Sequence, residues 1–132
     1  MKPTCTHVAL FCGDIEASVA FYERHVGLHE VHRRTDDATT VVWMGEQERT
    51  DTFVIVLLGI SHPPGDGAVA HLGYAVASRA EVDHAAERGH ADGLDVQGPV
   101  YAGPIVGYYC LLRDPDGNWI EFSHGQALGP TK

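Results

Sequence analysis

"AVAHLGYAVAS", residues 68–78, sets larger apolar residues among small ones and carries a histidine, His71, near its start. Such a short apolar run is typical of a buried β-strand. The run "CTHVALF", residues 5–11, has the same character, with His7 near its start. Two similar strands, each with an early histidine, raise the question of whether the chain contains an internal repeat.

The segments after each strand support a repeat. In the first half, a helix is predicted over residues 12–27, where Asp14 can cap the start and Gly27 can end it. Three extended runs follow, within residues 28–59. The first half therefore reads as one strand, one helix and three further strands.

The second half shows the same order. Ser78 and Glu81 have the spacing of a capping box, and Gly89 is a plausible end for the helix that they begin. Three extended runs follow within residues 94–125, and "DPDG", residues 114–117, joins the last two as a hairpin turn. Neither half can bury both faces of its sheet alone, so the two must pack together.

Composition excludes several classes of function. The chain has 132 residues, the size of one domain, and a formal net charge of −9 without a basic cluster, which argues against nucleic-acid binding. No apolar run is long enough to span a membrane, and no signal peptide is visible, so we expect a cytoplasmic protein. Three cysteines without a disulfide or zinc pattern agree with that compartment and are expected to be apolar fillers. Five other histidines are assigned to polar surfaces in or near helices: His25, His29, His32, His84 and His90.

Three residues stand at places where the repeat would form a metal site. His7 and His71 occupy equivalent positions in the two halves, and packing of the halves about a pseudo-two-fold axis would bring them together. Glu121 lies in the apolar strand "NWIEFSHG", where a buried carboxylate needs a partner or a metal. Two imidazoles and one carboxylate form a ligand set for Fe(II), Mn(II), Zn(II) or Ni(II), with no preference among them. A lone histidine or glutamate in a strand is more often structural, so the repeat is what favours one divalent metal.

The motifs "DIEASVAFYERHVGL", "HLGYAV" and "DPDGNWIEF" resemble the vicinal oxygen chelate superfamily, which includes glyoxalases, bleomycin-binding proteins and extradiol dioxygenases. The resemblance extends from about residue 5 to residue 124. It implies an α+β fold of two paired βαβββ modules, which form a curled mixed sheet around a cavity. Module one would cover residues 4–60, a linker residues 61–67, and module two residues 68–125. It also matches His7, His71 and Glu121 to the ligands of that superfamily.

Departures from the pattern narrow the subclass. Val56 occupies the position of the fourth ligand of glyoxalase I, and Ala9 and Leu111 replace accessory residues of other branches. Tyr109, on the same strand face as Leu111, could offer a hydroxyl from a shifted position, so the catalytic assignment is Glu121 and Tyr109. No other acid–base residue is assigned. The expected substrate-binding wall is apolar and aromatic, which suits flat organic molecules: Phe11, Trp43, Phe53, Val56, Leu111 and Trp119.

Two functions remain open at this point. The first is a metal-dependent enzyme, dioxygenase-like or lyase- or isomerase-like, whose small organic substrate chelates the metal through adjacent oxygens. The second is a protein of the bleomycin-binding type that sequesters an aromatic drug without catalysis. The retained ligand triad favours the first. The resemblance also implies a homodimer, with ligands possibly shared between its chains.

Overall fold

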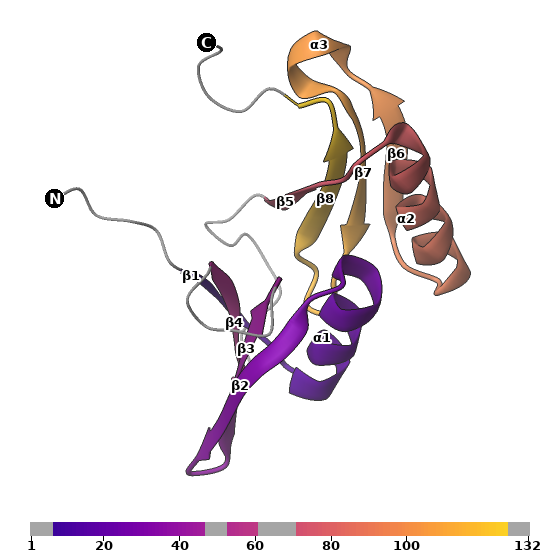
Figure 1. Ribbon diagram of the computed structural model, residues 1–132. Helices are drawn as coiled ribbons and strands as arrows, with labels where there is room; N and C mark the ends of the chain where they lie inside the picture. Colours follow the sequence, from indigo (N-terminus) through magenta and orange to yellow (C-terminus); the bar gives the residue numbers. More distant parts are fainter. Residues whose placement is uncertain (1–6, 47–52, 61–70, 127–132) are drawn as a thin grey trace, which may run out of the picture. The chain divides into compact units, whose positions relative to one another are not determined.

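One strand order occurs twice in the structure (Figure 1). The computed structural model describes residues 7–46, 53–60 and 71–126, and the chain divides into two compact units at residues 1–65 and 66–132. Each unit has a four-stranded mixed sheet in which the first strand pairs in parallel with the fourth. The expected α+β fold of βαβββ modules is therefore confirmed, whereas the predicted linker at residues 61–67 lies outside the described residues.

The first unit contains the sheet β1-β4-β3-β2, and α1 packs against β3 and β4. Its core lies between α1 and that sheet, where Val42, Met44 and Leu57 are fully buried. The elements are β1 (His7–Phe11), α1 (Ile15–Phe21), the π-helical turn η1 (Tyr22–Val26), β2 (His29–Asp36), β3 (Thr39–Gly45) and β4 (Val54–Leu58).

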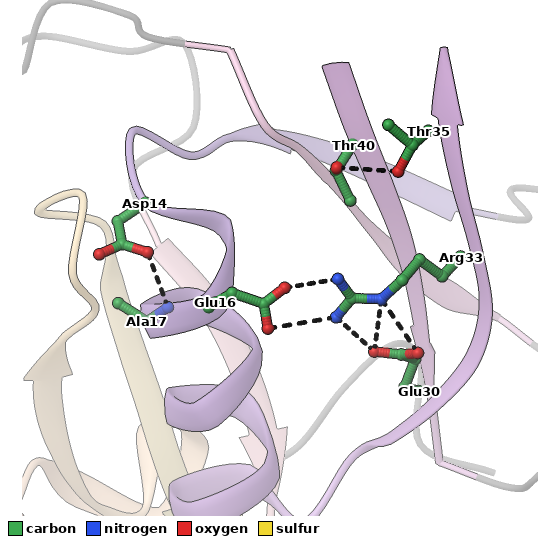
Figure 2. Close-up of polar contacts among 7 residues, drawn as sticks. All are labelled: Asp14, Glu16, Ala17, Glu30, Arg33, Thr35 and Thr40. Carbon is green, nitrogen blue, oxygen red and sulfur yellow. Dashed lines mark hydrogen bonds and ion pairs between the residues drawn. The ribbon is translucent and has the colours of Figure 1, made fainter. Parts of the chain in front are cut away.

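Local contacts explain where α1 begins and how β2 is tied to it (Figure 2). The Asp14 side chain accepts a hydrogen bond from the Ala17 N–H, as predicted for the N-cap, at 3.1 Å. Arg33 of β2 contacts the carboxylates of Glu16 on α1 and of Glu30 on its own strand. These contacts lower the pKa of the Glu30 carboxyl, chiefly through its hydrogen bond with Arg33. Arg33 therefore lies on the helix side of the sheet.

The second unit contains the sheet β5-β8-β7-β6, with α2 packed against β6, β7 and β8. The Ser78 hydroxyl accepts from the Glu81 N–H at 3.2 Å, which confirms the predicted cap of α2. No helix among the described residues is both long and apolar enough to cross a membrane. The elements are β5 (His71–Ala75), α2 (Arg79–Ala91), β6 (Val96–Tyr101), a short helix α3 (Gly103–Val106), β7 (Tyr108–Arg113) and β8 (Trp119–His124).

Two local predictions were wrong. Gly89 does not end α2, which continues to Ala91. It is buried inside the helix, where a Cβ would lie 2.8 Å from Val96 Cγ2. His25 is not on a polar surface, because it is 5% exposed and its ring lies 5.0 Å from that of Phe21. In both cases close packing decided the outcome, which residue type alone does not reveal.

The hairpin "DPDG" forms as predicted, with Asp114 as its organiser. The carboxylate of this buried residue accepts from the N–H groups of Asp116 and Asn118 at 3.0 and 2.8 Å, and from Asn118 Nδ2 at 2.9 Å. Gly117 adopts φ +88°, a conformation that glycine favours. The turn fixes the register of β7 with β8, in which Leu111 lies opposite Glu121.

Candidate metal centre

The pairing of β5 with β8 brings two of the three predicted metal ligands together. In this parallel pair, His71 lies beside Trp119 and Gly73 beside Glu121. Residues two apart on a strand share a face, so the side chains of His71 and Glu121 project from the same side of the sheet. The opposite side carries Ile120 and Phe122, which are buried towards α2. The face with Glu121 is called the helix-free face below.

The geometry of this pair fits joint coordination of one divalent ion. His71 Nε2 lies 3.8 Å from Glu121 Oε2, beyond hydrogen-bond range. Two ligand atoms that each bind a metal at about 2.0–2.2 Å can be separated by up to about 4.2 Å, so one ion could bridge them. The side chain of His71 is 48% exposed and that of Glu121 only 8%. The carboxylate is thus held inside, and the imidazole is accessible to a ligand.

Gly73 makes the room that the carboxylate occupies. A Cβ at this position would lie 3.1 Å from Glu121 Oε2, tighter than an ordinary contact. Any larger residue would push the carboxylate away from its present place. The small size of Gly73 therefore leaves space for the Glu121 carboxylate on the neighbouring strand. Glu121 is only 6% exposed, although a carboxylate is costly to bury.

The first unit has the same arrangement without the acid. In the pairing of β1 with β4, His7 lies beside Val54 and Ala9 beside Val56. Val56 thus holds the place in this unit that Glu121 holds in the other, and His7 the place of His71. His7 belongs to the other unit from the His71–Glu121 pair. Over the described parts of the chain, no three histidine, cysteine or acidic side chains gather closely enough to hold an ion.

Tyr109 lies two residue pairs away from Glu121 along the β7–β8 ladder. It is opposite Ser123, and Leu111 is directly opposite Glu121. Side chains opposite one another in an antiparallel pair share a face, so Tyr109 and Leu111 both lie on the helix-free face. The Tyr109 hydroxyl can therefore lie on the same face as Glu121, two residues before the Leu111 position, as the sequence suggested.

The predicted substrate-binding residues divide between the two units. In the first unit, Phe11 and Phe53 are 44% and 45% exposed, whereas Val56 is buried. Trp43 lies beside Val56 in the pairing of β3 with β4, and its ring centroid is 4.8 Å from that of His32. In the second unit, Leu111 and Trp119 flank Glu121 and His71. Each unit thus carries apolar side chains on the face that bears its histidine.

Sequence reasoning missed Arg113, which precedes the "DPDG" turn. Its guanidinium carbon lies 4.1 Å from the centroid of the Trp119 ring, on the helix-free face. The available signal was the spacing, because Arg113 and Trp119 flank the turn and a hairpin places such residues opposite each other.

Cys110 lies on the other side of the sheet and takes no part in this centre. It is fully buried and its thiol contacts the Val82 carbonyl oxygen. Cys12 is likewise buried and its thiol contacts the Leu10 carbonyl oxygen, so both agree with the expected role of apolar fillers. Burial is the main cause that raises the pKa of the Cys110 thiol to about 11, and the nearby Asp83 carboxylate adds to the effect. A thiol of this kind stays protonated at neutral pH.

Comparison with known proteins places this geometry in context. Residues 4–122 match the sequence model of the Glyoxalase/Bleomycin resistance protein/Dioxygenase superfamily. An uncharacterized protein of Pseudomonas aeruginosa is 43% identical over 98% of this chain and 94% of its own length. Uncharacterized protein YwbC of Bacillus subtilis is 28% identical over 92% of this chain and 98% of its own length.

Solved structures show the same fold at low identity. Glyoxalase I of Leishmania major has a TM-score of 0.77 at 20% identity and covers 94% of this chain and 88% of its own. The fosfomycin resistance protein FosX of Listeria monocytogenes, in a mutant complexed with Mn(II) and a dihydroxypropylphosphonic acid, has a TM-score of 0.74 at 20% identity over 97% of this chain and 96% of its own.

Proposed function

Because the chain belongs to the Glyoxalase/Bleomycin resistance protein/Dioxygenase superfamily, we propose that it is a divalent-metal enzyme acting on a small organic substrate with two adjacent oxygens. The observation that carries this proposal is the buried Glu121 carboxylate, for which Gly73 leaves room and which lies 3.8 Å from His71 Nε2. A buried acid without a cation is costly, and a shared metal is the simplest compensation.

His71 and Glu121 would hold the metal, and His7 would complete the set from the first unit of the same chain or of a partner. Imidazole and carboxylate ligands suit Fe(II), Mn(II), Zn(II) or Ni(II). When bound, such a metal supplies Lewis-acid stabilisation of charge that develops on a chelated oxygen. The FosX structure, which holds Mn(II) with a compound bearing two hydroxyl groups, supports the use of this fold for that purpose.

The residues around Glu121 indicate what the protein would contribute to the reaction besides the metal. Val56 cannot ligate, so the protein contributes three ligands and leaves open positions for substrate oxygens. Leu111, opposite Glu121, lines the site with apolar surface that excludes water. Tyr109 would donate its hydroxyl to a substrate oxygen, and Glu121 would accept a proton. This set suits dioxygenase-like chemistry, with lyase- or isomerase-like chemistry as the second option.

Metal retention tests the proposal directly. The purified protein is incubated separately with Mn(II), Fe(II), Ni(II) and Zn(II), desalted, and analysed for bound metal. We expect about one ion per chain for at least one metal and almost none for His71→Ala. His84→Ala is the matched control, because His84 is exposed on α2 and should leave the metal content unchanged. Absence of metal in the wild-type protein under all four conditions would overturn the proposal.

A binding protein for aromatic drugs is the second candidate, and the exposed Phe11 and Phe53 favour it. Such a protein would bind its ligand through apolar and aromatic surface and would need no metal. Bleomycin is the natural probe, given the name of the superfamily. Quenching of tryptophan fluorescence by bleomycin in a protein that retains no metal would establish this function in place of the first.

A further inference from the structure

A preformed cationic group lies two strands away from His71, on the face that carries the His71–Glu121 pair. Arg113 is the only arginine or lysine among the described strand residues on the helix-free face of the second unit. Trp119 is the register partner of His71 on one side and of Arg113 on the other. The three residues therefore follow one line across β5, β8 and β7, and strand spacing puts about 10 Å between the outer two backbones.

Three contacts hold the guanidinium in one orientation. Its carbon lies 4.1 Å above the Trp119 ring, Nη1 donates to the Gly117 carbonyl oxygen at 2.7 Å, and Nε lies 3.4 Å from Asp95 Oδ2. A guanidinium that is stacked and hydrogen-bonded in this way has little conformational freedom left to lose when it binds a ligand. The side chain nevertheless remains 42% exposed.

The contacts leave part of the guanidinium available. Within residues 7–46, 53–60 and 71–126, nothing hydrogen-bonds to Nη2. The partner at Nε is an Asp95 side chain that is 74% exposed. Exposed ion pairs are weak, so a ligand anion can compete with Asp95. If Arg113 only stabilised the 114–117 turn, its hydrogen bond to the Gly117 carbonyl oxygen would be enough. Stacking on Trp119 instead directs the guanidinium over the face that bears His71 and Glu121.

We propose that Arg113, stacked on Trp119, binds a carboxylate on the substrate at the end opposite its two chelating oxygens. The inference rests on the proposed function, because the chelating oxygens need the metal. A carboxylate fits better than a doubly charged group, since the guanidinium offers one open edge and is partly neutralised by Asp95. Arg113 would thus select among substrates that share the same pair of oxygens.

Two matched probes test this on the protein loaded with the metal that it retains. Protocatechuate is a catechol that bears a carboxylate, and the corresponding methylcatechol bears a methyl group in its place. Titration calorimetry gives both dissociation constants. We expect wild-type protein to bind protocatechuate about tenfold more tightly than methylcatechol, as a charged hydrogen bond commonly provides. Arg113→Gln should abolish the preference and leave methylcatechol binding unchanged.

A second variant should strengthen protocatechuate binding, and it leaves the hydrogen bond between Arg113 and Gly117 in place. Asp95→Asn removes the competing carboxylate, so protocatechuate should bind about threefold more tightly, within the range of a surface ion pair. A purely structural Arg113 would leave the ratio of the two dissociation constants unchanged in both variants, and that result overturns the inference. So does a wild-type protein that holds metal but binds no protocatechuate. Failure to retain any metal would instead refute the proposed function itself.

Discussion

Gly73 shows how much depends on one absent side chain. Its missing Cβ gives the Glu121 carboxylate its place beside His71, and the equivalent residue of the first unit, Ala9, faces Val56 instead of an acid. At this position the first unit pairs Ala9 with the apolar Val56, whereas the second unit pairs Gly73 with the acidic Glu121. In the proposed metal site, where ligand geometry controls metal affinity, this pair would decide which unit supplies the carboxylate.

Gly73→Ala should weaken metal binding about tenfold without unfolding the protein, since displaced supporting groups typically have effects of that size. The added Cβ would lie 3.1 Å from Glu121 Oε2 and force the carboxylate to move. Competition with a coloured chelator measures the affinity. Ala75→Gly, two residues further on the same strand face, is the control and should retain wild-type affinity. Unchanged binding in Gly73→Ala would show that Glu121 is not a ligand.

Cys110 makes a prediction about alkaline stability. Its thiol pKa rises from 9.0 to about 11 in the folded protein, so the folded state holds its proton more tightly than the unfolded state does. This contribution is complete below pH 9 and is lost as the pH rises towards 11, by roughly 2–3 kcal/mol in all. Urea denaturation between these pH values should show the loss, and Cys110→Ala should remove most of it. Equal pH profiles for the two proteins would contradict the assignment.

At the scale of elements, α2 and the hairpin determine where β8 lies. Gly89 allows α2 to pack closely against Val96 and Leu112, and Asp114 closes the turn that sets the β7–β8 register. A shift of one residue in that register would move Glu121 to the helix side and Phe122 to the opposite face. The turn and the helix therefore position the acid although neither contacts it.

Gly89→Ala should destabilise the protein by about 1–3 kcal/mol, because its Cβ would lie 2.8 Å from Val96 Cγ2 and 3.0 Å from Leu112 Cδ2. The better helix propensity of alanine would act in the opposite direction by about 1 kcal/mol and should not compensate. Chemical denaturation gives the value, and His90→Ala, at the exposed neighbouring position, gives the baseline. A stabilised Gly89→Ala variant would show that the helix can move away from the sheet.

At the scale of the whole molecule, the proposed metal site raises the question of which chain would supply His7. The β1–β4 pair carries the predicted ligand His7, and the β5–β8 pair carries His71 and Glu121, so the proposed triad would need both units. We propose a homodimer in which the first unit of one chain joins the second unit of its partner. Such an exchange would place the triad across the dimer and would make each site depend on two chains.

Mixing two variants that each lack one proposed metal ligand tests this arrangement. His7→Ala and His71→Ala chains, unfolded and refolded together in equal amounts, should regain about a quarter of the wild-type metal content if the sites are shared, because half the dimers are mixed and each has one intact site. Each variant refolded alone is the control and should hold almost none. No recovery in the mixture, in a dimer shown by sedimentation, would place each site within one chain.

The sequence by itself determined the repeat, the caps at Asp14 and Ser78, the "DPDG" turn and the strand assignment of His7, His71 and Glu121, because these depend on local periodicity and turn chemistry. Only tertiary structure decided that Gly89 continues α2, that His25 is buried, that Gly73 makes room for the Glu121 carboxylate and that Arg113 stacks on Trp119. Each of these depends on contact between residues distant in the chain, where available space and strand register, and not local propensity, set the energy.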